Sequence, residues 1–198
     1  MTAGKMVQKP ETDEQALHAA SRAAMEKEVG EAIRRIIVSA FINMAGLDAT
    51  VGANKPHTEP ADPRNSVTGT IDWAGSWRGI GVLDCTPEFA CRLASLMLAT
   101  EATELDQNAL DAVAEMTNII FGSLKRQLEP IFGRMDLNLP TVSYEEVMAL
   151  ELERPKFMVI PVQIEDHSLR LRLLITQVRG WVRPVEEEPK AKVVVRAA

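Results

Sequence analysis

The chain has 198 residues, of which 46% are hydrophobic and 25% charged, and it carries a formal net charge of -6 with an isoelectric point near 5.2. This composition predicts one globular domain with a loose end or two, and it excludes wholesale disorder. The acidic balance argues against a nucleic-acid surface, which needs clustered Lys and Arg. No run approaches the roughly 18 apolar residues of a membrane span, and the start lacks a signal-peptide core, so we expect a soluble cytoplasmic protein.

Residues 13–45 are predicted to form the first helix. Apolar side chains recur there at spacings of three and four, which is typical of an amphipathic helix, and Gly46 is suited to end it. The segment 52–66 holds three prolines and many turn-forming residues. It is therefore expected to be a loop or a short edge element.

Alternation with a period of two begins at residue 66 and predicts a β-hairpin. The first strand covers residues 66–73, the turn residues 74–76, and the second strand residues 77–84. Thr86 is suited to cap a following helix, since Pro87 fits the first helical position.

Three further strands are expected in the last third of the chain, within residues 138–146, 156–166 and 168–178, and the alternation is clearest in the last of them. Pro161 cannot donate a hydrogen bond to a ladder, so its strand is expected to lie at an edge or to carry a bulge. The order of elements predicts an α+β fold, with an antiparallel sheet packed by two or three helices.

The helix expected over residues 110–128 combines a buried stripe with a row of polar residues. The stripe consists of Leu110, Val113, Thr117, Phe121, Leu124 and Leu128. Asp111, Glu115, Asn118 and Gly122, here called the polar row, fall within about 60° of one another on a neighbouring face. Gly122 costs about 1 kcal/mol relative to Ala, which suggests that something approaches the helix closely. The other interpretation is an ordinary solvated face.

Other residue types that often carry chemistry give weaker signals. Cys85 and Cys91 are predicted to be buried or half-buried thiols rather than a disulfide, and neither has an activating base nearby. The three histidines are scattered, which argues against a His-based metal site or catalytic triad. Packing in the core or on the sheet is expected for Trp73, Trp77 and Trp181.

The sequence resembles the CheC/CheX/FliY group of response-regulator phosphatases, specifically its CheX branch. The family pattern is Asp or Ser, three residues, Glu, two residues, Asn, and a Pro about twenty-two residues later. Here Asp111, Glu115 and Asn118 follow that pattern, and Pro140 comes after an interval of twenty-one residues. The similarity extends from about residue 28 to about residue 178, over "LDAVAEMTNIIFGSLK", "LNLPTV" and the hairpin with its following helix.

The resemblance implies hydrolysis of the aspartyl-phosphate on a CheY-like response regulator. It implies that Asn118 orients the attacking water and that Glu115 docks against the lysine of the receiver domain. Asp111 and Gly122 would border the contact. Pro140 would be structural, starting a strand that supports the helix.

The resemblance also implies the cofactor, the oligomeric state and the domain bounds. No cofactor of its own is expected, whereas Mg²⁺ is expected on the partner receiver domain. A single copy of the motif matches the CheX branch, which implies a homodimer, with residues 156–165 as a candidate edge for pairing. The CheX-like phosphatase domain is expected over residues 26–182. Residues 1–25 would be a flexible extension or the start of the first helix, and residues 183–198 a charged tail.

Two other functions remain open from the sequence. One is a non-catalytic CheX-like adaptor that docks a receiver or another signalling partner. The other is a structural subunit related to the flagellar switch. The intact polar row favours the phosphatase, because a domain kept only for docking has no need of an amide that positions water.

Overall fold

The computed structural model describes residues 13–53, 55–56, 66–144 and 158–177, and the side chains of residues 26–53, 66–144 and 158–176. The helices are α1 (Asp13–Ala45), α2 (Pro87–Leu98) and α3 (Gln107–Phe132). The strands are β1 (Thr50–Val51), β2 (Lys55–Pro56), β3 (Val67–Gly75), β4 (Trp77–Cys85), β5 (Met135–Leu137), β6 (Thr141–Tyr144), β7 (Met158–Ile164) and β8 (His167–Gln177).

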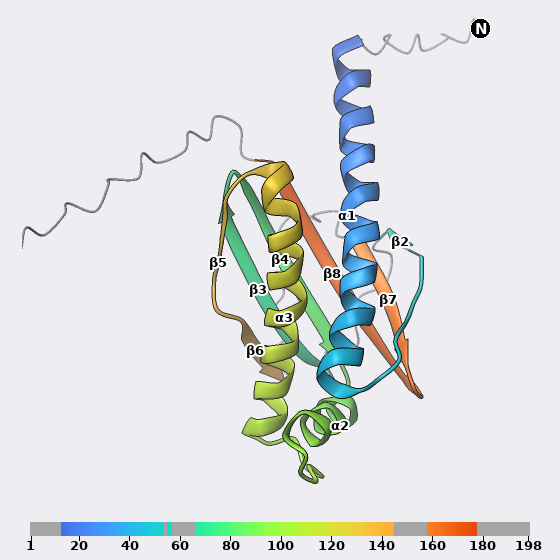
Figure 1. Ribbon diagram of the computed structural model, residues 1–198, viewed down its shortest axis with the longest axis vertical. Helices are drawn as coiled ribbons and strands as arrows, with labels where there is room; N and C mark the ends of the chain where they lie inside the picture. The colour runs from blue at the N-terminus through green and yellow to red at the C-terminus, as the bar shows by residue number, and fades with distance from the viewer. Residues whose placement is uncertain (1–12, 54, 57–65, 145–157, 178–198) are drawn as a thin grey trace, which may run out of the picture.

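The described strands form one antiparallel sheet in the order β1-β7-β8-β4-β3-β5, with β2 also paired to β7 and β6 also paired to β3. Helices α1 and α3 lie side by side across one face of this sheet, and α2 lies at one end of it (Figure 1). The predicted fold class, an antiparallel sheet packed by two or three helices, is confirmed.

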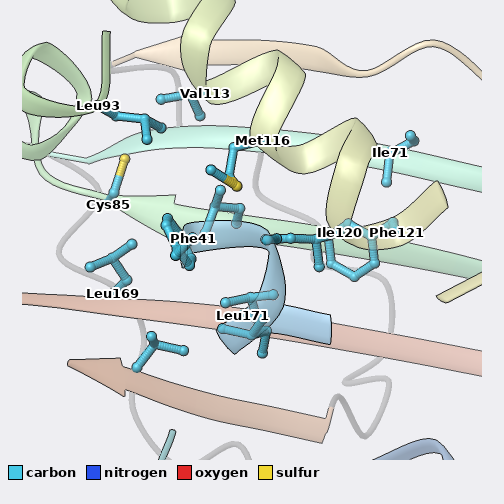
Figure 2. Close-up of a cluster of buried hydrophobic side chains, with 14 of the residues drawn as sticks. Phe41, Ile71, Cys85, Leu93, Val113, Met116, Ile120, Phe121, Leu169 and Leu171 are labelled. Atoms are coloured by element: carbon cyan, nitrogen blue, oxygen red, sulfur yellow. The ribbon is translucent and has the colours of Figure 1, made fainter. Parts of the chain in front are cut away.

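The core lies between the helices and the covered face of the sheet. Figure 2 shows Phe41 of α1 and Ile120 of α3 close to Leu171 of β8, and all three are fully buried. The alternation expected in β8 is present, because Leu169 and Leu173 are also buried on this face. The burial of these apolar side chains away from water is the main contribution to the packing of the helices on the sheet.

Two glycines of the sheet allow α3 to lie unusually close to it. A Cβ atom at Gly81 would come within 2.5 Å of the ring of Phe121, and one at Gly69 would collide with the hydroxyl of Thr117. The hydroxyl of Thr117 is fully buried and donates to the Val113 carbonyl oxygen at 2.7 Å, so it needs no partner from the sheet. Helix α3 is therefore fixed directly on β3 and β4.

Side-chain caps define where α2 and α3 begin. The hydroxyl of Thr86 accepts a hydrogen bond from the Phe89 amide at 3.3 Å, which confirms the predicted cap. Asp106 caps α3 in the same way, accepting from the Ala109 amide at 3.0 Å. Such caps satisfy backbone N–H groups that the first turn of a helix leaves without partners.

The elements with a strong local pattern agree with the sequence predictions. The hairpin turns at residues 74–76, α1 begins at residue 13, and the three expected strands correspond to β6, β7 and β8. The short strands β1 and β5 were not predicted as strands, whereas β2 lies within residues 52–66, for which a loop or a short edge element was expected. Trp181 and the expected tail over residues 183–198 lie outside the described residues.

The strand of Pro161 was expected to lie at an edge or to carry a bulge; it is not an open edge, but its pairing is interrupted beside Pro161, where the register shifts by one residue between Val51↔Val162 and Lys55↔Val159. Strand β1 pairs with residues 162–163 of β7, and β2 pairs with residues 158–159. Between them the Gly52 amide donates to the Pro161 carbonyl oxygen at 2.9 Å. Pro161 thus stands in the gap between two short strands, where no N–H donor is needed. The part of residues 156–165 that forms β7 is already paired along this side, so it is not an open edge.

Candidate active site

The polar row lies along the side of α3 that faces away from the sheet. Asp111 and Glu115 are exposed, while Asn118 and Gly122 are half-buried. The opposite side of the helix is buried as predicted, from Val113 through to Leu128, with Leu110 half-buried. Because α3 is tightly packed along one side, the backbone positions of the residues on its other side are fixed relative to one another.

The hydrogen bonds of the row differ from residue to residue. The Gln107 side-chain amide donates to Asp111 Oδ1 at 2.7 Å. Within the described part of the chain, neither Glu115 nor Asn118 has a hydrogen-bond or ion-pair partner. The carboxylate and the amide are thus both available to a partner that contacts this side of α3.

Gly122 is not required by packing within the described chain. A Cβ atom there would lie 3.9 Å from Leu137 Cδ2 and 3.9 Å from Arg126 Nη1, which are ordinary contact distances. The backbone at Gly122 is helical, so any residue could adopt it. A glycine here leaves an open strip of backbone beside Asn118.

The structure places Pro140 directly before β6, as expected for a residue that starts a strand. Strand β6 pairs with residues 67–70 of β3 and contacts α3. Strands β5 and β6 run along one side of α3, and α1 lies along the other (Figure 1). The polar row is therefore bordered by β5, β6 and the short connection between them.

The two basic residues that follow the row are held by neighbours on the same helix. Lys125 Nζ lies 3.5 Å from Glu129 Oε1, and Arg126 Nη2 donates to Ser123 Oγ at 2.8 Å. These contacts place positive charge at the far end of a row that begins with carboxylates. The charge of the row itself is at the end formed by Asp111 and Glu115, and the two basic residues lie beyond its other end.

The cysteines are free and buried, as predicted. Burial raises the pKa of the Cys85 thiol, with smaller contributions from Asp84 and Cys91, and burial also raises the pKa of Cys91. A thiol whose pKa is raised is mostly protonated near neutral pH and is a poor nucleophile. Across the described residues, no group of three or more His, Cys, Asp and Glu is placed to hold a metal ion.

The residues of the polar row lie at the surface of α3, where they are exposed or half-buried. An open depression of about 410 Å³ lies elsewhere, between α2 and the segment that precedes α3, and its lining includes Glu88, Cys91 and Arg92 but no residue of the row. Small-molecule sites are usually concave, so a row on the outer side of a helix is suited to a macromolecular partner.

None of the described helices has the length and apolar content needed to cross a bilayer.

Comparison with known proteins gives a family match for the centre of the chain. Residues 67–163 match the family model described as the chemotaxis phosphatase CheX. That span includes the hairpin, α2, the whole of α3 with its polar row, and Pro140. No curated protein matches the chain.

Solved structures with a similar fold cover about three quarters of the chain. The chemotaxis protein CheX from Vibrio vulnificus is 20% identical, with a TM-score of 0.64 over 75% of this chain and 99% of that one. CheX in its complex with CheY, BeF3 and Mg²⁺ from Borrelia burgdorferi is 22% identical, with a TM-score of 0.62 over 74% and 97%. FliY from Thermotoga maritima is 18% identical, with a TM-score of 0.57 over 75% and 87%.

Proposed function

The chain is a CheX-like member of the CheC/CheX/FliY chemotaxis phosphatase family, and on this premise we propose that it hydrolyses the aspartyl-phosphate of a CheY-like response regulator. The observation that carries the proposal is the pair Glu115 and Asn118. Both belong to one side of a rigidly packed helix, and neither has a partner among the described residues. The Borrelia burgdorferi CheX structure, in complex with CheY, supports a receiver as the partner.

Asn118 is assigned the positioning of the attacking water. Its Oδ1 accepts a hydrogen bond from the water, and its Nδ2 donates to a phosphoryl oxygen. The water oxygen attacks phosphorus in line with the bond to the aspartyl oxygen, that bond breaks, and inorganic phosphate and a free carboxylate result. Phosphoryl transfer depends mainly on orientation and charge stabilisation, so one neutral amide in a fixed position is sufficient.

Glu115 is assigned the docking of the receiver. It precedes Asn118 by three residues, and side chains at that spacing reach the same side of a helix. Its carboxylate pairs with the lysine beside the phosphorylated aspartate, which sets the depth to which Asn118 enters the site. Asp111 and Gly122 border the contact, and Pro140 starts the strand that supports the helix.

The charge of the phosphoryl group is neutralised from the receiver's side in this proposal. The receiver holds Mg²⁺ and supplies the lysine, so the phosphatase needs no cofactor of its own. The exposed row contributes orientation, and the receiver contributes the electrostatic part of the catalysis.

Loss of phosphate from a phosphorylated, Mg²⁺-loaded CheY-like receiver tests the assignment. We expect Asn118→Ala to slow the accelerated rate by about a hundredfold, because misplacement of a reacting group has an effect of that size. Glu115→Ala is expected to raise KM more than it lowers kcat. Gln127→Ala removes an exposed amide from the same helix outside the row and is the matched control.

Two results would contradict the phosphatase. If the wild type leaves the receiver's own decay unchanged while still binding it, the adaptor reading replaces the enzyme. If Asn118→Ala and Gln127→Ala reduce the rate equally, the amide of the row has no special part in the reaction.

A cytoplasmic homodimer completes the proposal. The single copy of the motif is the feature that supports a dimer, by analogy with the CheX branch. Light scattering coupled to gel filtration is expected to give twice the 21.8 kDa mass of one chain. A mass of one chain at micromolar concentration would overturn this part without affecting the assignment of Asn118.

A further inference from the structure

The connection between β5 and β6 joins two strands that lie along one side of α3 (Figure 1). It consists of residues 138–140, since β5 ends at Leu137 and β6 begins at Thr141. Leu137, the last residue of β5, lies beside Gly122, with its Cδ2 atom 3.9 Å from where a Cβ would stand, the same distance as Arg126 Nη1. A partner that contacts α3 along the row therefore meets this connection as well.

The connection is held firmly against β3. The Asn138 amide donates to the Asp72 carbonyl oxygen at 3.0 Å, and the Asn138 side chain donates to Asp72 Oδ2 at 2.7 Å. On either side, β5 pairs with residues 73–75 and β6 with residues 67–70. Only three residues connect β5 to β6. Leu139 also has restricted backbone freedom, because it directly precedes Pro140.

This fixed connection presents Leu139 to solvent. Its side chain is 87% exposed, the highest value among the large exposed apolar residues of the described chain. A single exposed leucine is common and needs no explanation by itself. What distinguishes Leu139 is its position, between a clamped asparagine and a proline, at the border of an acidic row whose side chains have open hydrogen-bonding capacity.

We propose that Leu139 is a docking anchor for the receiver domain, and this inference rests on the proposed function. The acidic end of the row, Asp111 and Glu115, complements a basic group on the receiver. Leu139 adds an apolar contact at the edge of the same surface, where it covers the rim of the receiver's phosphorylation site. Burial of an exposed apolar side chain favours association, and a pre-ordered side chain loses little freedom on binding.

The test measures binding and turnover separately. Affinity for a receiver loaded with Mg²⁺ and beryllofluoride, a mimic of the phosphoryl group, is measured by calorimetry for wild type, Leu139→Ala and Leu139→Asp. The rate of dephosphorylation is measured against receiver concentration in parallel. Ile42→Ala is the matched control, since Ile42 is 45% exposed on α1, along the other side of α3 (Figure 1).

We expect Leu139→Ala to raise both Kd and KM by about tenfold, the size of effect found for an interface anchor. Its kcat should stay within about twofold of wild type, because Leu139 does not touch the reacting atoms. Leu139→Asp should weaken binding further, and Ile42→Ala should leave binding unchanged. Unaltered urea midpoints would show that the Leu139 variants fold normally.

Failure of this inference is distinguishable from failure of the proposed function. An active wild type whose Leu139 variants bind and turn over normally overturns the anchor alone. A wild type that binds the loaded receiver without hydrolysing the phosphorylated one overturns the phosphatase, while a loss of binding in Leu139→Asp still supports the anchor. A wild type that does neither overturns both.

Discussion

Gly122 is the residue at which stability and activity are expected to diverge. An alanine would fit, since its Cβ would make only ordinary contacts, and replacing a glycine inside a helix gains up to about 1 kcal/mol. We therefore expect Gly122→Ala to raise the urea midpoint. The same methyl group narrows the open strip beside Asn118, so the rate of receiver dephosphorylation should fall by several-fold.

Gly81→Ala is the contrasting variant for this experiment. A Cβ at Gly81 meets the ring of Phe121 at 2.5 Å, and overpacking of this kind costs about 1–3 kcal/mol. Gly81→Ala should lower the urea midpoint, whereas Gly122→Ala should raise it. A Gly122→Ala protein that is more stable and equally active would show that the receiver does not approach the helix backbone here.

At the scale of the element, the cap of α3 makes the helix sensitive to acid. The hydrogen bond from the Ala109 amide lowers the pKa of Asp106 below its ordinary value of 3.8, with smaller contributions from Asn108. Because the folded-state pKa is the lower one, the cap contributes its full stability above the unfolded value. That contribution is lost as the pH falls through the folded value.

Asp106→Asn separates the cap from its titration. Asparagine caps a helix about as well as aspartate does but carries no charge, so this variant should lose less stability than wild type between about pH 5 and pH 2. Thermal unfolding at a series of pH values gives the comparison. Asp106→Ala, which removes the cap at every pH, is the reference. If the unfolding temperatures of Asp106→Asn and wild type fell in parallel with pH, titration of Asp106 would not be the cause of the acid sensitivity.

The elements that were predictable from the sequence are those with a signal inside the element itself. The Thr86 cap, the hairpin turn at residues 74–76 and the alternation of β8 each show in a few adjacent residues, and each is confirmed. Strands β1 and β2 have two residues each, too few for any period. That these two strands cover β7 on either side of Pro161 could not be predicted either, because they lie about a hundred residues earlier in the chain.

The residues of the candidate site also divide into those that the sequence alone predicts and those that only the structure reveals. The polar row was predictable, because helical periodicity alone places Asp111, Glu115 and Asn118 on one side. Leu139 was not predictable, since its exposure depends on where β5 and β6 pair with β3 and on the hydrogen bonds of Asn138 to Asp72. In the sequence, a leucine between an asparagine and a proline has nothing to distinguish it.

At the scale of the whole molecule, one ion pair links the two middle strands of the sheet. Arg172 of β8 donates through Nε and Nη2 to the two carboxylate oxygens of Asp84 on β4, both at 2.8 Å. The hydroxyl of Thr68 donates to the same carboxylate at 3.1 Å. Asp84 is only 3% exposed, so these donors take the place of the water molecules that would otherwise hydrogen-bond to its carboxylate.

Arg172→Met is expected to destabilise the protein by about 3 kcal/mol, because it leaves a buried carboxylate without its counter-charge. Adding Asp84→Asn should recover part of that loss, since the neutral amide is less costly to bury and its Oδ1 can still accept from Thr68. Urea unfolding of the single and double variants measures both effects. A single variant within 0.5 kcal/mol of wild type, on the order of an ordinary surface change, would show that solvent reaches the pair.

The place of β8 in the sheet has a consequence for synthesis. It is the last described strand in the chain, yet it lies in the middle of the sheet, between β7 and β4. Arg172 and Asp84 are 88 residues apart in sequence, and such distant pairings form slowly. Helix α3 leaves the ribosome well before β8 exists. A nascent or truncated chain that ends before residue 167 thus contains the whole polar row and Pro140 without the strand at the centre of the sheet. The presence of these residues in such a fragment is therefore no evidence that it folds or acts as the full chain does.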